Sequence, residues 1–94
     1  MIYVIARAEV KPDKFEDYLD ELRKIVPDVR AEDGCIGYEP CRDLNEDGCF
    51  VTIIEMWESE AHWRTHMTTP HMARFKAAAG GWRVGNTVYA VKPL

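Results

Sequence analysis

The chain has 94 residues, 47% hydrophobic and 30% charged, which is the composition of one small globular domain rather than a disordered or low-complexity segment. Lys and Arg number 12 against 16 Asp and Glu, so the net charge is −4, and no basic stripe favours nucleic-acid binding. The first apolar stretch ends at Arg7, too early for a signal peptide or a membrane span, so we expect a cytoplasmic protein without a membrane partner.

The first predicted element is a strand over residues 2–10, because its even-numbered residues are all apolar. A helix follows, in which Asp13 is the expected N-cap and Glu16 completes a capping box. Pro27 is expected to kink or break the last turns of this helix, and Gly34 is a natural stop. Seven apolar residues form one helical stripe: Phe15, Tyr18, Leu19, Leu22, Ile25, Val26 and Val29.

Two strands are predicted next, over residues 35–42 and 49–57, from their branched and aromatic side chains. Pro40 cannot donate a hydrogen bond to a neighbouring strand, so it needs an edge or bulge position. Residues 44–48 end in Asp-Gly, which favours a hairpin between the two strands.

Two short helices and a last strand complete the predicted elements. Ser59 can cap a helix that extends to Met67, and Pro70 suits the first position of the next helix. Gly80-Gly81 ends that helix, and residues 84–92 have the alternating pattern of a strand.

The resulting order is β-α-β-β-α-β, the ferredoxin-like α+β fold, over a single domain of residues 1–94. Both faces of the third strand are apolar: Val51 and Trp57 point one way, whereas Ile54 and Met56 point the other. An antiparallel sheet with one solvated face would instead alternate apolar and polar residues. Because the helices cover one face only, we expect a homodimer in which two sheets pack together.

The cysteines and glycines predict no metal or nucleotide site. Cys35, Cys41 and Cys49 cannot all pair within one chain and lack C-x-x-C spacing, so we expect free, mostly buried thiols. The glycines form neither a phosphate loop nor a dinucleotide fingerprint. A nucleotide or a flavin could still bind, although no motif indicates one.

The three histidines allow several interpretations. His62 and His66 are four residues apart and could begin a metal site with His71 or a carboxylate, but two histidines are weak evidence and we expect no metal. We interpret His62 as a solvated helix residue. His66 and His71 are either core or cap residues or general bases, since imidazole titrates near neutral pH.

Glu55 and the aromatic residues are candidates for a binding site. Glu55 lies between two inward-pointing apolar residues, so it either hydrogen-bonds to Arg7, Lys92 or a histidine, or belongs to a polar cluster that lines a pocket. Most of the aromatic rings belong to the core or a dimer surface, but some could enclose a flat ligand, with methionines as adaptable walls.

Several segments resemble the antibiotic biosynthesis monooxygenase family. The densest similarity lies within residues 55–75 and includes Glu55–Ser59 (EMWES), His66 and Thr69–Met72 (TPHM). The strand at 2–6, Lys11-Pro12 and Asp33–Tyr38 (DGCIGY) also resemble this family, so the similarity covers nearly the whole chain. Two further segments resemble its bacterial quinol monooxygenase branch: Lys24–Pro27 (KIVP) and Gly37–Pro40 (GYEP).

The resemblance implies a dimeric α+β barrel with one pocket per subunit between helices and sheet. It implies oxidation of a quinol or flat phenol by O2 without metal, haem or a tightly needed flavin. His66 or His71 could take the substrate proton, Tyr38 or Glu55 could bind substrate oxygens, and Trp57 could wall the ring. The substrate-binding candidates are Tyr38, Glu55, Trp57, Trp63, Met67, Met72 and Phe75.

The same fold family contains two other enzyme types. Haem-degrading members place a catalytic Trp and an axial His where this chain has His66 and Lys76, which argues against haem. Members that isomerise a phosphorylated signalling compound share a similar stretch from His66 to His71, and Arg74, Lys76 and Arg83 could contact such a substrate. A non-catalytic dimeric module that binds a quinone-like ligand is the third interpretation, because a fold alone does not settle function.

Overall fold

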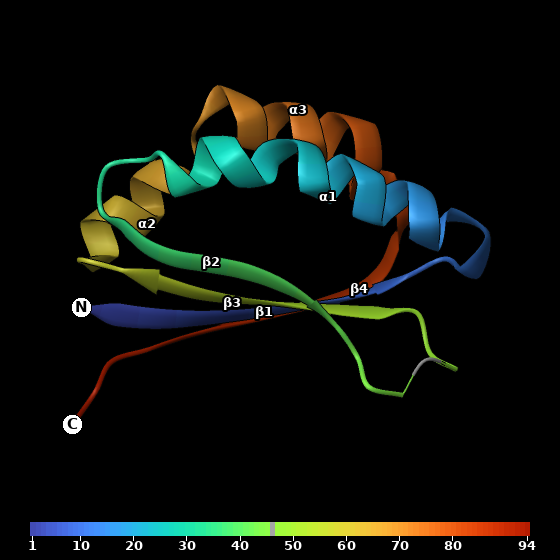
Figure 1. The fold of residues 1–94 in the computed structure, drawn as a ribbon, viewed down its shortest axis with the longest axis horizontal. Helices are drawn as coiled ribbons and strands as arrows, with labels where there is room; N and C mark the ends of the chain where they lie inside the picture. The colour runs from blue at the N-terminus through green and yellow to red at the C-terminus, as the bar shows by residue number, and fades with distance from the viewer. Residues whose placement is uncertain (46) are drawn as a thin grey trace.

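A four-stranded antiparallel sheet carries all the helices on one face, which is the predicted ferredoxin-like arrangement (Figure 1). The computed structural model describes residues 1–45 and 47–94. The strands are β1 (Ile2–Val10), β2 (Cys35–Arg42), β3 (Phe50–Trp57) and β4 (Arg83–Val91). The helices are α1 (Phe15–Arg30), α2 (Glu60–His66) and α3 (Pro70–Ala79), with short 3-10 turns η1 (Pro12–Lys14) and η2 (Gly80–Trp82).

The strands lie in the order β2-β3-β1-β4, so the central pair comes from distant parts of the chain. Pro40 lies on an edge strand, as predicted from its missing N–H. Strands β2 and β3 pair from Arg42 and Val51 onward, as the hairpin prediction requires. The predicted turn at 44–48 includes residue 46, which lies outside the described residues.

Helix α1 begins later than predicted, and of the two outcomes expected at Pro27 it does not show a break. Asp13 is not the N-cap, because Pro12 starts a separate 3-10 turn and α1 begins only at Phe15, after Lys14. Pro27 does not break the helix, which continues to Arg30. Buried Ile25 and Val29 flank Pro27, and their packing against the core offsets the one missing backbone hydrogen bond.

The core lies between the helices and the inner face of the sheet. Alternate residues of β1 point into it, with Val4, Ala8 and Val10 buried as the period of two predicts. Ser59 caps α2 by accepting a hydrogen bond from the backbone N–H of His62, which confirms that prediction.

The outer face of the sheet carries apolar side chains that no helix covers. Ile5 is paired with Ile54 on one side and Tyr89 on the other, which makes an apolar row across three strands. A second row joins Met56, Tyr3 and Val91. Ile5, Ile54, Tyr89 and Val91 are all exposed, as the two-faced pattern of β3 predicts for a single copy of the chain.

Cys35, Cys41 and Cys49 are free thiols, as predicted, although each is only partly buried. Among the described residues, no helix combines the length and the apolar character needed to cross a bilayer.

Candidate active site

A cavity of about 190 Å³ lies between the helices and the inner face of the sheet. Its wall is mostly apolar or aromatic, and four groups of stronger polarity reach it: Glu55, His66, Arg83 and Asn86. Seven of the nine predicted site residues line it: Tyr38, Glu55, Trp63, His66, Met67, Met72 and Phe75. An apolar enclosure with a few convergent polar groups is typical of a small-molecule site.

A larger surface groove of about 380 Å³ runs between α1 and β2 and is a weaker candidate. Its three arginines are each engaged by a carboxylate: Arg23 by Asp20, Arg30 by Glu39 and Arg42 by Glu16. The charges in the groove are therefore already paired. None of the histidine or aromatic side chains that line the cavity lines this groove.

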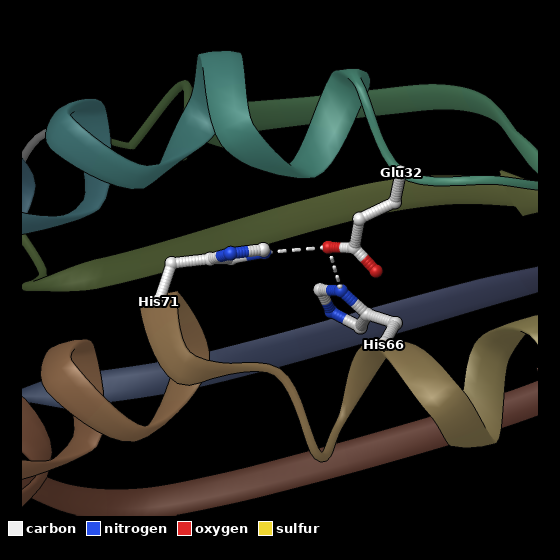
Figure 2. Close-up of side chains that lie close together, drawn as sticks. All are labelled: Glu32, His66 and His71. Atoms are coloured by element: carbon white, nitrogen blue, oxygen red, sulfur yellow. Dashed lines mark hydrogen bonds and ion pairs between the residues drawn. The ribbon is translucent and has the colours of Figure 1, made fainter.

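His66 on the cavity wall is joined to His71 through the carboxylate of Glu32 (Figure 2). Nδ1 of His66 lies 2.8 Å and Nε2 of His71 2.7 Å from the same atom, Oε2 of Glu32. His66 is 3% exposed, and the side chains of Glu32 and His71 are 11% and 13% exposed. Because a carboxylate only accepts hydrogen bonds, both imidazoles donate to it, and the other nitrogen of His66 carries the lone pair when the ring is neutral.

Two aromatic rings fix the orientation of the His66 imidazole. The Trp57 ring lies 4.7 Å from it, centroid to centroid, and the Tyr38 ring lies 5.8 Å away. Trp57 has no exposed surface and is not part of the cavity lining, so it supports His66 from beneath rather than walling the cavity.

Glu55 accepts a hydrogen bond from Nε1 of Trp57 at 2.9 Å, so its partner is none of the three that the sequence suggested. Arg7 instead binds Asp43. Burial, with a smaller contribution from the charge of Glu32, raises the pKa of Glu55 to about 7. At neutral pH a large fraction of the molecules therefore carry a proton on this carboxyl group.

The phenol of Tyr38 stays protonated at neutral pH. Burial and the nearby charge of Glu55 raise the pKa of Tyr38 well above its usual value of 10. Tyr38 can therefore donate a hydrogen bond to a ligand oxygen in the cavity, but it is a poor candidate for a base.

A family model described as antibiotic biosynthesis monooxygenase matches residues 1–78 of the chain. The chain belongs to this family. A protein named "Probable quinol monooxygenase YgiN" from Escherichia coli (strain K12) is 38% identical over a 90-position alignment, and the match covers 86% of this chain and 86% of that one. The chain is therefore a monooxygenase, an enzyme of the oxidoreductase class.

Solved structures agree with this family assignment. A crystal structure described as an antibiotic biosynthesis monooxygenase superposes with a TM-score of 0.91 at 26% identity, covering 100% of this chain and 99% of that one. The structure of Rv0793 from Mycobacterium tuberculosis superposes with a TM-score of 0.89 at 28% identity, covering 99% and 94% of the two chains.

His71 does not line the cavity of this monooxygenase, although it was predicted beside His66 as a catalytic candidate. It lies at the start of α3 and faces Glu32. The connection from α2 to α3 is held by Thr69, whose hydroxyl donates to the carbonyl oxygen of His66 at 2.9 Å. The turn therefore directs both imidazoles to one carboxylate.

His62 is not the solvated residue that the sequence suggested. Its Nδ1 lies 2.7 Å from Oγ of Ser59, and its Nε2 lies 3.5 Å from Asp33. It packs on Gly34, where a side chain would collide with it. His62 therefore belongs to the contact between α2 and the turn after α1, and is not part of the cluster of Glu32, His66 and His71.

Sequence reasoning missed Glu32, which lies behind His66, and also Tyr18 and Asn86 in the cavity lining. Glu32 follows α1, outside any periodic pattern, and its two histidine partners lie 34 and 39 positions further along the chain. The one local signal is the neighbouring Gly34, whose φ of 83° makes the tight turn that holds Glu32 beside the cavity.

Proposed function

We propose that this monooxygenase oxidises a quinol or a flat phenol with O2 and requires no metal or organic cofactor. The observation that carries the proposal is the position of His66, on the wall of an apolar cavity with Glu32 behind it. The name of the Escherichia coli relative, which specifies a quinol, supports the substrate class.

A quinol can supply every electron that the reaction needs. One quinol and one O2 give one hydroxyquinone and one water, with four electrons leaving the quinol to reduce both oxygen atoms. The protein then has to deprotonate the substrate, exclude water and stabilise charge on the reduced oxygen. These are tasks for side chains rather than for a redox centre.

His66 is the proposed proton acceptor. Its Nδ1–H donates to Glu32, which leaves Nε2 to take the proton of a substrate hydroxyl. The imidazolium that forms is stabilised by the carboxylate at 2.8 Å. His71, which donates to the same carboxylate oxygen from outside the cavity, is proposed to position Glu32 rather than to contact substrate.

The remaining cavity groups have proposed roles in binding. Protonated Glu55 and Tyr38 donate hydrogen bonds to oxygens of the substrate or of reduced O2. Met67, Met72 and Phe75 cover the faces of the ring. Arg83 is the one cation in the described lining, so the cavity suits a neutral ring better than the phosphorylated substrate of an isomerase.

We also propose that the enzyme acts as a homodimer joined through the outer faces of two sheets. The two exposed apolar rows centred on Tyr3 and Ile5 support this arrangement, because an apolar patch of this kind is rarely left in water by a monomer.

Oxygen uptake with reduced naphthoquinone tests the proposed activity. We expect enzyme-dependent O2 consumption above the spontaneous rate and a hydroxylated quinone among the products. A thermal shift with the oxidised quinone, measured in parallel, reports binding alone. A shift without any turnover would instead favour a non-catalytic module that binds quinones.

A further inference from the structure

We propose that Glu32, His66 and His71 form a binding site for a divalent transition-metal ion of the zinc class. Each residue offers one ligand atom, and these three atoms all lie within 4.8 Å of one another. Two imidazoles and a carboxylate are a donor set that binds Zn²⁺ in proteins, with water in the fourth position. This proposal concerns binding and does not depend on the proposed oxidation of a quinol.

The distances suit an ion between the three side chains after a small expansion. Oε2 of Glu32 lies 2.8 Å from Nδ1 of His66 and 2.7 Å from Nε2 of His71 (Figure 2). Around a tetrahedral zinc ion, neighbouring N and O ligands are about 3.4 Å apart, since each bond is about 2.1 Å. Each nitrogen would therefore move roughly 0.6 to 0.7 Å further from Oε2 of Glu32, and the ion would replace the two protons that now bridge these atoms.

The three ligands are held in place before any ion arrives. Trp57 packs against the His66 ring, and Thr69 fixes the turn that leads to His71. Glu32 lies in a turn closed by its own N–H, which donates to the carbonyl oxygen of Val29. A site built in this way loses little conformational entropy on binding.

An ion can reach Glu32 without passing through the substrate cavity. A separate surface depression of about 310 Å³ borders Glu32 and is also lined by Asp33, His62, Thr65 and Thr69. Asp33 adds a second carboxylate at this entrance, which attracts a cation. The depression also supplies water for the remaining coordination position.

Metal binding would have a defined effect on the proposed proton acceptor. A neutral imidazole has one proton, so an ion on Nδ1 of His66 leaves that proton on Nε2. His66 could then no longer accept a proton from the substrate. If the proposed function holds, Zn²⁺ inhibits turnover and a chelator restores it, so the metal acts as an inhibitor rather than a cofactor.

Titration calorimetry with Zn²⁺ on the full chain, first treated with a chelator that is then removed, tests the binding. We expect one ion per chain and weaker binding as the pH falls, because protons compete for the imidazoles. Glu32→Gln and His71→Gln should each weaken binding at least tenfold. Glu9→Gln, which changes an exposed carboxylate on β1 outside both the cluster and the depression, is the matched control and should bind Zn²⁺ like the wild type.

Three results would overturn the proposal. The first is the absence of saturable binding to the wild type. The second is undiminished binding by Glu32→Gln and His71→Gln; if circular dichroism shows one of these variants to be unfolded, the other decides. The third is a near-ultraviolet spectrum of the Co²⁺-loaded protein with thiolate charge-transfer bands, which would place the ion on the cysteines. Binding is measured without substrate, so failure to oxidise quinols leaves these results interpretable.

Discussion

The imidazole of His62 occupies the space in which a side chain on residue 34 would begin. A Cβ atom added to Gly34 would lie 2.2 Å from Cγ of His62, and the φ angle of Gly34 is +83°. Gly34→Ala should therefore lower the free energy of unfolding by about 2 kcal/mol or more, from backbone strain and displacement of His62. Urea denaturation with a constant m-value measures this loss.

Gly81→Ala is the matched control for this substitution. A Cβ at residue 81 meets nothing within 4 Å, and Gly81 has no positive φ angle. Its free energy of unfolding should change by less than about 0.5 kcal/mol. If both variants lose the same free energy of unfolding, the close contact between His62 and Gly34 makes no specific contribution to stability.

His66→Gln should reduce turnover about 10²- to 10⁴-fold, the usual contribution of a positioned acid-base group. Glutamine keeps hydrogen-bonding capacity and approximate volume, so folding should survive. Steady-state oxygen uptake measures the loss of turnover, and circular dichroism checks that the variant is folded.

His71→Gln should have a smaller effect than His66→Gln, because His71 lies outside the cavity and acts through Glu32. His62→Gln should keep nearly full activity, since it contacts neither the cavity nor the cluster. A folded and fully active His66→Gln enzyme would rule out His66 as the base and direct attention to Glu55.

Glu55→Gln should change how stability depends on pH. Burial raises the pKa of Glu55 from its usual value of 4.5 to about 7, so the folded state holds an extra proton between these values. The stabilising contribution of this group is therefore fully present below about pH 4.5 and is lost as the pH rises through about 7. Because Gln cannot ionise, the stability of the variant relative to wild type should increase by at most about 3 kcal/mol from pH 5 to pH 8.

Urea denaturation of both proteins at several pH values provides this comparison. Glutamine can still accept the hydrogen bond from Trp57, so the difference isolates the ionisation of residue 55. A difference in stability that stays constant across the pH range would mean that Glu55 ionises like an exposed carboxyl group.

Ile54→Lys should dissociate the proposed homodimer or unfold the chain. Ile54 lies in the apolar row with Ile5 and Tyr89, and an unpaired charge buried there costs several kcal/mol. Multi-angle light scattering at micromolar concentration measures the mass of each variant. Ala77→Lys, at an exposed position of α3, is the control and should remain dimeric. A wild-type chain that is monomeric in this experiment would refute the dimer.

Most of the fold could be predicted because its elements have strong periodic patterns. The alternating residues of β1 and the apolar stripe of α1 each specify one buried face, and both faces meet in the core. Helix boundaries were less predictable, because the short turn begun by Pro12 competes with a capping box at Asp13. The choice between the 3-10 turn and the capping box depends on packing against the rest of the chain, which no local sequence pattern encodes.

The site was predictable only where strand alternation or a motif placed a residue on the inner face. Glu55 and Tyr38 were found in this way, and the structure brings them into one cavity. Alternation also points Trp57 inward, but it cannot distinguish a cavity wall from the support beneath His66. Glu32 and the contacts of His62 depend on segments that meet only in three dimensions.

The two edges of the sheet differ in whether they can accept another strand. Pro40 removes one N–H from β2, whereas β4 is free of proline and exposed from Val84 to Val91. Two β4 edges that met would form one continuous sheet bounded on both sides by β2. A further strand would therefore add less readily to β2 than to β4, because Pro40 cannot complete a backbone hydrogen-bond ladder at the β2 edge.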